Sequence, residues 1–242
     1  MPKPIVFADL DDTLFQSHRK MDGLDIDRQV ATAANGDPRK ASFMTPKQTA
    51  LFEWLHKTTE LIPVTARSVD AFSRVALPFA SWAILSNGAV IQEPGGAVHA
   101  PWENQMRAVL YDFAPTMQDI LDQGRAAAID QDIDVRSWIV QEDGMASYVV
   151  FKLNTVTEAS LKGLKALPLP VTDWTRHFNA DALAIIPPGS GKAVAVDYLH
   201  GVLNADGSRP TLGFGDSLSD LTYMTSTDIL LTPRQSQIAT TL

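Results

Sequence analysis

Four apolar residues run directly into a cluster of carboxylates near the start of this 242-residue chain, and few folds accommodate that combination. Residues 5–8 are Ile-Val-Phe-Ala, and residues 9–13 are Asp-Leu-Asp-Asp-Thr. An apolar run without alternation is typical of a strand buried on both faces, as in a parallel sheet covered by helices. The run therefore predicts an α/β fold with polar groups gathered where this strand ends.

Later segments extend the same pattern of strands and helices. Apolar runs predict further core strands at residues 61–65, 82–85 and 211–215, with helical segments between them. Pro63 counts against a central position for the strand at 61–65, because proline cannot donate to the hydrogen-bond ladder.

Two neighbouring segments near the N-terminus differ in how much they predict. Thr45 can cap a helix, Pro46 suits the first helical turn, and Gln48 completes a capping box. Residues 16–42 are polar and show no clear periodicity, so we expect a long connection that is functional or mobile.

The pattern changes in the middle of the chain. Hairpin signals there alternate with helical segments, among them a helix at about 102–121 and an antiparallel pair turned at Asp143-Gly144. We therefore expect an α/β protein with a Rossmann-like parallel-sheet core and an inserted α+β cap domain. The expected core is residues 1–88 and 187–242, and the expected cap is residues 89–186.

Polar residues follow several of the predicted core strands. Asp9, Thr65, Asn87 and Asp216 each come at the end of an apolar run. Open parallel sheets bind ligands at the carboxyl ends of their strands. We therefore expect these four residues to share one site, although they are far apart in the sequence.

Asp9 and Asp11 are two residues apart, so they point to the same side if the strand continues through Asp9. Carboxylates placed together repel each other unless a cation lies between them. Mg²⁺ prefers oxygen ligands and meets that need. A carboxylate can also attack phosphorus, while its neighbour transfers a proton to the leaving oxygen. A solvated acidic loop is the alternative for these two residues taken alone.

Five more residues bear on a phosphate site. Asp216 and Asp220 are four apart, so they share a face if a helix begins there. Lys192 stands at the start of a predicted helix, where an anion is favoured by the helix dipole. Thr65 offers a hydroxyl at a strand end, although such a threonine is usually structural. Arg67 can pair with an acidic residue or a phosphate, and structural pairing with an acid is the favoured expectation.

These pieces together resemble the haloacid dehalogenase-like hydrolase superfamily, whose four motifs appear here in order. Residues 9–13 fit its Asp-x-Asp-x-Thr motif, and the second and third motifs are matched by Thr65 and Lys192. Residues 215–216 with Asp220 fit the fourth motif. The segment 86–89 and the insert after it are similar to the type II-B cap group, which includes Cof-like and sucrose-phosphate phosphatases.

The resemblance implies a role for each matching residue. It implies that Asp9 is the nucleophile and Asp11 the general acid and base. Asp9, the backbone carbonyl of Asp11 and Asp216 would bind Mg²⁺, with Asp220 supporting that site. Thr65 and Lys192 would hold the phosphoryl group. The further residue Asn87 would reach the substrate.

The resemblance predicts a phosphoric monoester hydrolase that acts on a small phosphate ester, with a sugar phosphate as the favoured substrate class. A phosphotransferase or phosphomutase on the same fold is the alternative, and a non-catalytic binding protein is a remote one. Tryptophan and basic residues in the predicted cap could contact a sugar or could serve the cap's own core. The sequence does not choose a particular ester or an oligomeric state.

Two other motifs are present only in part. Residues 215–218 (Gly-Asp-Ser-Leu) are similar to a motif of lipase-like esterases with Ser217 as nucleophile, but all five histidines lie upstream of it. The Gly-Ser-Gly-Lys run before residue 193 is no P-loop, because Ile186 and Ala193 replace the required glycine and hydroxyl residue.

Composition limits the partners and the compartment. A formal net charge of −8 argues against a general nucleic-acid surface. No stretch approaches the roughly 18 apolar residues of a membrane span. The chain has no cysteine, so disulfides and thiolate chemistry are excluded. We expect a cytoplasmic enzyme without a nucleic-acid or membrane partner.

Overall fold

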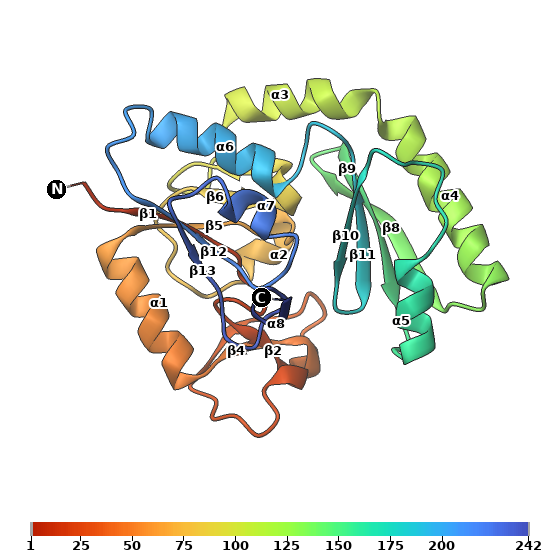
Figure 1. The fold of residues 1–242 in the computed structure, drawn as a ribbon, viewed down its shortest axis with the longest axis horizontal. Helices are drawn as coiled ribbons and strands as arrows, with labels where there is room; N and C mark the ends of the chain where they lie inside the picture. The colour runs from red at the N-terminus through yellow and green to blue at the C-terminus, as the bar shows by residue number, and fades with distance from the viewer. Residues whose placement is uncertain (1, 242) are drawn as a thin grey trace. The chain divides into compact units, whose positions relative to one another are not determined.

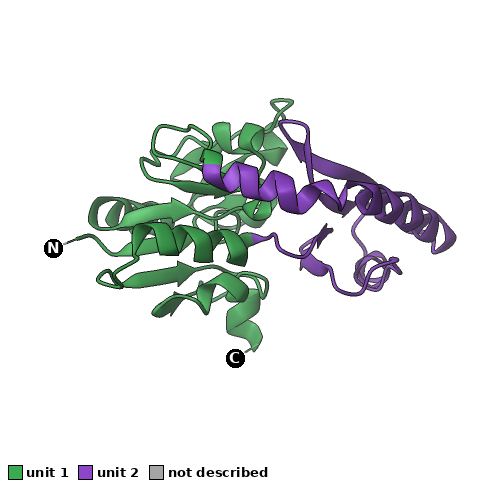
Figure 2. Ribbon diagram, turned by 90° about the horizontal axis from the view of Figure 1, so that it is seen from above, with its two compact units in different colours: residues 1–100, 192–242 green, residues 101–191 purple. Residues whose placement is uncertain are grey.

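The computed structural model describes residues 2–241, which form two compact units (Figures 1 and 2). Unit 1 comprises residues 1–100 and 192–242, and unit 2 comprises residues 101–191. Residues 89–100, expected in the insert, thus belong to unit 1. Strand β7 (Val90–Gln92) pairs antiparallel with β6 (Ala83–Leu85), and this pairing ties the segment to unit 1.

Unit 1 is built on a parallel sheet with the strand order β13-β12-β1-β5. These strands are β1 (Ile5–Ala8), β5 (Glu60–Pro63), β12 (Thr211–Phe214) and β13 (Ile229–Leu231). All four residues of β1 are fully buried, which agrees with an apolar run that has no polar face. The α/β core expected from the sequence is therefore confirmed.

Pro63 is the last residue of β5 and fits there without a lost hydrogen bond. The N–H of Val64 donates to Ala8 in β1, whereas the N–H of Thr65 donates to Ile84 on the other side. Because successive residues alternate, the nitrogen of Pro63 points away from β1. On that side the ladder toward β6 begins only at the bridge between Val64 and Ile84.

Helices cover both faces of this sheet, with α1 (Pro46–Thr58) and α6 (Lys192–Leu203) on opposite sides (Figure 1). The N–H of Gln48 donates to the Thr45 hydroxyl oxygen, the N–H of Thr45 donates to the Gln48 side chain, and Pro46 opens the helix. The predicted capping box is therefore present. The shorter helices are α2 (Val69–Ser73), α7 (Leu221–Met224) and α8 (Gln237–Thr241).

Residues 16–42 are more ordered than expected. The short strands β2 (Gln16–Ser17), β3 (Arg28–Ala31) and β4 (Ser42–Met44) form an antiparallel sheet in the order β2-β4-β3. The 3₁₀ turns η1 (His18–Lys20) and η2 (Pro38–Lys40) lie between them, and η3 (Ser86–Gly88) follows β6. The sequence analysis expected a functional or mobile connection and did not predict these strands, because strands this short leave no detectable period.

Unit 2 is α+β, as expected for the insert. Its antiparallel sheet has the order β10-β11-β9-β8, from β8 (Val135–Glu142), β9 (Met145–Leu153), β10 (Thr175–Asn179) and β11 (Ala182–Ile186). Helices α4 (Ala114–Asp130) and α5 (Glu158–Lys165) pack on this sheet. Asp143 and Gly144 turn β8 into β9 with φ angles of 45° and 74°.

The predicted helix at 102–121 is two helices. Helix α3 (Ala100–Tyr111) ends before Asp112, and α4 starts at Ala114 with Pro115 in its first turn. Proline is favoured at a helix start and would disrupt a continuous helix interior. Across residues 2–241, no helix combines the length and the hydropathy that crossing a membrane requires.

Candidate functional site

Three carboxylates meet at the carboxyl ends of the central strands of unit 1. Asp9 directly follows β1, Asp216 comes two residues after β12, and Asp220 precedes α7. Each offers an oxygen, and these oxygens lie within 4.8 Å of one another. All three residues are buried, with at most 6% of their surface exposed. The fold therefore brings together the acids that the sequence assigned to one site.

Lys192 joins two of these carboxylates. Its Nζ donates to Oδ1 of Asp9 at 2.7 Å and to Oδ1 of Asp220 at 2.8 Å. The lysine is itself buried, as the first residue of α6. An ammonium between two carboxylates offsets part of the cost of burying three negative charges.

The loop from β12 to α7 orients Asp220. Oδ2 of Asp220 accepts hydrogen bonds from the N–H and the hydroxyl of Ser217, at 3.1 and 2.6 Å. Together with Lys192, these donors occupy both oxygens of Asp220. This carboxylate is thus suited to hold Lys192 and the loop rather than to face a ligand.

Gly215 permits the close approach of Asp220 to the end of β12. A Cβ added at Gly215 would lie 2.5 Å from the Cβ of Asp220 and 3.0 Å from Sδ of Met224. The contact with the Cβ of Asp220 cannot be relieved without moving the start of α7. The glycine is therefore required by packing, and the loop that carries Asp216 and Asp220 depends on it.

Thr13 is a site residue to which the sequence analysis gave no role of its own. Its hydroxyl lies 3.1 Å from Oδ1 of Asp216, to which it donates, and 3.4 Å from Oδ2 of Asp9. It is 3% exposed. Its position as the last residue of the Asp-x-Asp-x-Thr motif was the available signal.

Asp11 stands apart from the three buried acids and pairs with Arg67. The Arg67 Nε donates to Oδ2 of Asp11 at 2.8 Å, and Nη2 donates to Oδ1 at 2.7 Å. The Asp11 side chain is 42% exposed, whereas that of Arg67 is 18% exposed. The sequence offered a carboxylate or a phosphate as the partner of Arg67, and in this structure the partner is Asp11.

Thr65 and Asn87 lie together beside this pair. The Thr65 hydroxyl oxygen accepts the N–H of Arg67 at 3.1 Å, and the Thr65 carbonyl accepts the N–H of Asn87 at 3.0 Å. Asn87 has a left-handed φ of 54° and is 2% exposed. Its Nδ2 is buried and donates to no protein atom among residues 2–241. A buried amide without an acceptor is costly, so it is suited to a ligand oxygen.

The charges of the site are unbalanced. Burial raises the pKa of Asp9 well above its ordinary value, despite the opposing charge of Lys192. Burial and the nearby Asp220 raise the pKa of Asp216 to about 6. Burial would also raise the pKa of Asp220, but the charge and hydrogen bond of Lys192 outweigh it and lower that pKa. Three carboxylates around one ammonium leave an excess of negative charge.

This excess fits a divalent cation. The donors are all oxygens, as Mg²⁺ prefers, and two of the three carboxylates, Asp9 and Asp216, keep an oxygen that neither Lys192 nor Ser217 holds, whereas both oxygens of Asp220 are occupied. The raised pKa values of these two residues describe the site without an ion, where protonation is the other way to reduce the repulsion. The residues present therefore suit Mg²⁺.

Ser217 lacks the surroundings of a nucleophilic serine. Within residues 2–241, the hydrogen bonds of its hydroxyl run to Asp220 at 2.6 Å and to Ser219 at 2.7 Å. Neither partner is a histidine that could act as a base. The geometry thus gives no support to a serine esterase.

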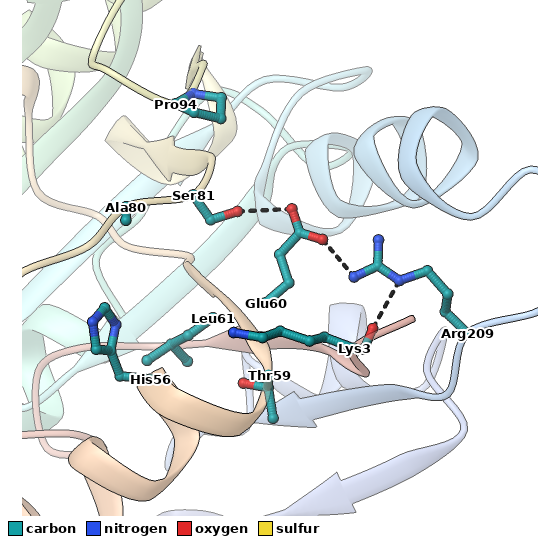
Figure 3. A pocket seen from close by; sticks show the side chains of 9 residues that line it. All are labelled: Lys3, His56, Thr59, Glu60, Leu61, Ala80, Ser81, Pro94 and Arg209. Carbon is teal, nitrogen blue, oxygen red and sulfur yellow. Dashed lines mark hydrogen bonds and ion pairs between the residues drawn. The ribbon is translucent and has the colours of Figure 1, made fainter. Parts of the chain in front are cut away.

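A cavity of about 560 Å³ lies elsewhere in unit 1 and contains none of these residues (Figure 3). It is at the amino ends of the strands, where Glu60 begins β5. Figure 3 shows Arg209 paired with Glu60, which also accepts a hydrogen bond from Ser81. Arg209 of this cavity is thus already neutralised by the protein, whereas the cavity holds none of the clustered carboxylates, and we place the functional site at the acid cluster.

Comparisons with known proteins identify the fold. No family model matches the sequence, and no curated protein sequence matches it. Among solved structures, the sucrose-phosphatase of Synechocystis sp. PCC6803, in complex with sucrose and phosphate, is 17% identical with a TM-score of 0.57; the match covers 98% of this chain and 85% of that one.

Two further structures are similar. The C-terminal domain of C. albicans trehalose-6-phosphate phosphatase is 13% identical with a TM-score of 0.56, over 93% of this chain and 73% of that one. A haloacid dehalogenase-like hydrolase from B. subtilis is 13% identical with a TM-score of 0.50, over 95% and 94%. The chain thus shares the fold of these hydrolases, which is the fold that the sequence analysis expected.

Proposed function

We propose that this chain is a Mg²⁺-dependent phosphatase that hydrolyses a small phosphate monoester through a phosphoryl group carried on Asp9. The observation that carries the proposal is the position of Asp9. Its carboxylate is buried at the end of β1, 2.7 Å from the Lys192 ammonium and beside two further carboxylates. The Asp11 side chain, two residues on, is 42% exposed.

The roles of the other residues follow from their contacts. Asp9, Asp216 and the backbone carbonyl of Asp11 would hold Mg²⁺, and Asp220 would support them by fixing Lys192. When bound, Mg²⁺ would offset the charge of the phosphoryl oxygens and keep Asp9 ionised. Phosphoryl transfer depends mainly on such positioning and charge neutralisation.

In the first step, an oxygen of Asp9 forms a bond to phosphorus while the bond from phosphorus to the leaving oxygen breaks. Asp11, in its protonated form, gives its proton to that oxygen, so the product leaves as an alcohol. The Lys192 ammonium, the Thr65 hydroxyl and the Asn87 amide are the protein donors suited to the phosphoryl oxygens.

In the second step, Asp11 accepts a proton from water as the water oxygen forms a bond to phosphorus. The bond between phosphorus and Asp9 then breaks, and its electron pair returns to the carboxylate. Inorganic phosphate is released, and both aspartates regain their starting states. The cycle consumes one water molecule for each ester.

We place sugar phosphates first among the substrates to be assayed. The named structural relatives include phosphatases of sucrose phosphate and trehalose phosphate, although identities of 17% and 13% relate the folds and not the substrates. A panel of hexose phosphates, disaccharide phosphates and phosphoglycerate esters, assayed for free phosphate, tests the substrate class. Isomerised hexose phosphate in place of free phosphate would indicate a phosphomutase instead.

The activity itself is tested with the substitution Asp9→Asn. Wild-type protein should release phosphate from p-nitrophenyl phosphate only with Mg²⁺, and Asp9→Asn should abolish turnover while keeping the fold. Asp197→Asn is a matched control, because Asp197 is an exposed acid on α6. Undiminished Mg²⁺-dependent activity in Asp9→Asn would rule out the proposed nucleophile.

A further inference from the structure

We propose that Arg67 is a positioning residue that fixes the Asp11 carboxylate in the orientation needed to transfer protons. This inference rests on the proposed phosphatase function and adds a residue through which Asp11 is controlled. It predicts that Arg67 matters most for esters whose leaving oxygen must be protonated.

The contact between the two side chains is bidentate. Nε and Nη2 of Arg67 donate to the two different oxygens of Asp11, at 2.8 and 2.7 Å. Two parallel hydrogen bonds of this kind fix the plane of a carboxylate, which a single ammonium donor cannot do. Asp11 therefore has one preferred orientation, although 42% of its side chain is exposed.

Arg67 is itself held by three separate segments of unit 1. Its Nη2 also donates to the Ser42 hydroxyl oxygen in β4 at 3.2 Å, and its guanidinium carbon lies 5.1 Å from the centre of the Phe15 ring. Its carbonyl accepts the N–H of Ser86, and its N–H donates to Thr65. Because both its backbone and its guanidinium are held, Arg67 is a rigid support for a partly exposed acid.

The β2-β4-β3 sheet thereby gains a role. Ser42 lies in β4, and Phe15 immediately precedes β2, so this small sheet supplies two of the contacts that hold Arg67. Asp11 and Phe15 also form an isolated β-bridge. The segment expected to be a functional or mobile connection thus contributes, through Ser42, to the support of the proposed acid and base.

Leaving-group chemistry separates this role from simple binding. A p-nitrophenolate leaves without a proton, whereas the oxygen of an alkyl or sugar phosphate must receive one. If Arg67 acts by orienting Asp11, its loss slows cleavage of the alkyl ester far more than cleavage of the aryl ester. An arginine that only bound phosphate, or only stabilised the fold, would affect both esters alike.

The test compares rapid-mixing kinetics of wild type, Arg67→Gln and the control Arg74→Gln. Arg74 is a second arginine of unit 1 with a carboxylate partner, Asp70, and neither residue contacts the acid cluster. For Arg67→Gln we expect single-turnover cleavage of glycerol phosphate to fall about 100-fold, the scale of general-acid catalysis. The burst of p-nitrophenolate should keep its amplitude and its rate close to those of wild type.

A double-substitution cycle keeps the inference testable if Arg67→Gln has other effects. In an Asp11→Asn background, Arg67→Gln should cause no further loss with glycerol phosphate, because both act through one group. Arg67→Lys, which keeps the charge but loses the fork, replaces Arg67→Gln if that variant does not fold.

Three outcomes would overturn the inference. The first is an equal loss with both esters, the second is no loss with either, and the third is a full additional loss in the Asp11→Asn background. A wild-type protein that cleaves neither ester would instead overturn the proposed function, and the inference with it. The two failures are therefore distinguishable.

Discussion

At the scale of single residues, Gly215 controls whether the acid cluster can assemble. A Cβ there would lie 2.5 Å from the Cβ of Asp220, so Gly215→Ala must displace the start of α7. We expect a loss of about 1–3 kcal/mol in the free energy of unfolding, the usual cost of overpacking a buried site. Urea denaturation measures this.

A matched glycine provides the control for this prediction. Gly201 lies in α6, and no atom is within 4 Å of the position that its Cβ would occupy. Gly201→Ala should stabilise the protein by about 0.5–1 kcal/mol through helix propensity. If Gly215→Ala proved as harmless as Gly201→Ala, the close packing of Asp220 on β12 would be wrong.

Asn87 is the second residue whose role can be isolated. Its left-handed φ of 54° suits glycine, and its Nδ2 has no protein acceptor among residues 2–241. Asn87→Gly should therefore leave the thermal midpoint unchanged or raised, while kcat/KM falls by roughly 10-fold for the loss of one hydrogen bond to a charged ligand. A large loss of stability with unchanged kcat/KM would contradict the assignment to substrate.

Sequence reasoning predicted residue types better than their partners. Asp9, Asp216, Asp220 and Lys192 were recognisable because each follows a strand or begins a helix, and one contact network joins them. The pairing of Asp11 with Arg67 spans 56 positions in the chain, so no local pattern could identify Asp11 as the acidic partner. The assigned roles remain predictions until activity is measured.

At the scale of elements, Asp228 fastens the last two strands of the core sheet to each other. Its Oδ2 accepts hydrogen bonds from the N–H and the hydroxyl of Thr211, at 2.8 and 2.9 Å. These hydrogen bonds lower the pKa of Asp228 from its ordinary value of 3.8. The stability that the Asp228 carboxylate contributes is therefore complete at a pH above the ordinary pKa of 3.8. It is lost as the pH falls through the lower pKa of the folded state.

Removing this carboxylate should change the acid sensitivity of the protein. In Asp228→Asn, the free energy of unfolding at pH 7 should be lower than in wild type. Its further loss between pH 5 and pH 3, a range of about one pH unit on either side of the ordinary pKa, should be smaller than in wild type. Urea midpoints across this range measure it, with exposed Asp197→Asn as the control. Parallel curves for wild type and Asp228→Asn would contradict the role of the Thr211 contacts.

Helices and turns were predictable where the sequence contains a capping box or a characteristic turn pair. The capping box at Thr45 and the turn at Asp143-Gly144 both appear as expected. Strands β2, β3 and β4 were not predicted, because their order comes from pairing with one another and not from a pattern within each. The break between α3 and α4 was not predicted, although Pro115 in the first turn of α4 was an available signal for it.

At the scale of the whole molecule, the fold was predictable and the substrate was not. The order of the four motifs along the chain predicts which strands end at one site. The similar solved structures confirm the fold, although their sequence identities are 17% or less. Substrate choice depends on side chains that vary freely on a common fold. The assay panel is therefore needed to resolve what the architecture leaves open.

Metal binding should be visible in the stability of the whole protein. Three buried carboxylates share one lysine, so Mg²⁺ should raise the thermal midpoint of wild-type protein, and EDTA should reverse the rise. At 100 times the dissociation constant, the expected gain is about 2.7 kcal/mol. Asp216→Asn removes a proposed ligand and should abolish most of the shift. An equal shift in wild type and Asp216→Asn would place the ion elsewhere.

The central claim is that Asp9 carries the phosphoryl group during turnover. In the most direct measurement, the enzyme is mixed with Mg²⁺ and with p-nitrophenyl phosphate that carries radioactive phosphorus. The reaction is quenched rapidly with acid, and the labelled peptide is then mapped. We predict acid-stable, hydroxylamine-sensitive label on the peptide that contains Asp9, and none in Asp9→Asn. Label on another residue, or steady turnover by wild-type protein with no labelled peptide at any quench time, would contradict the account.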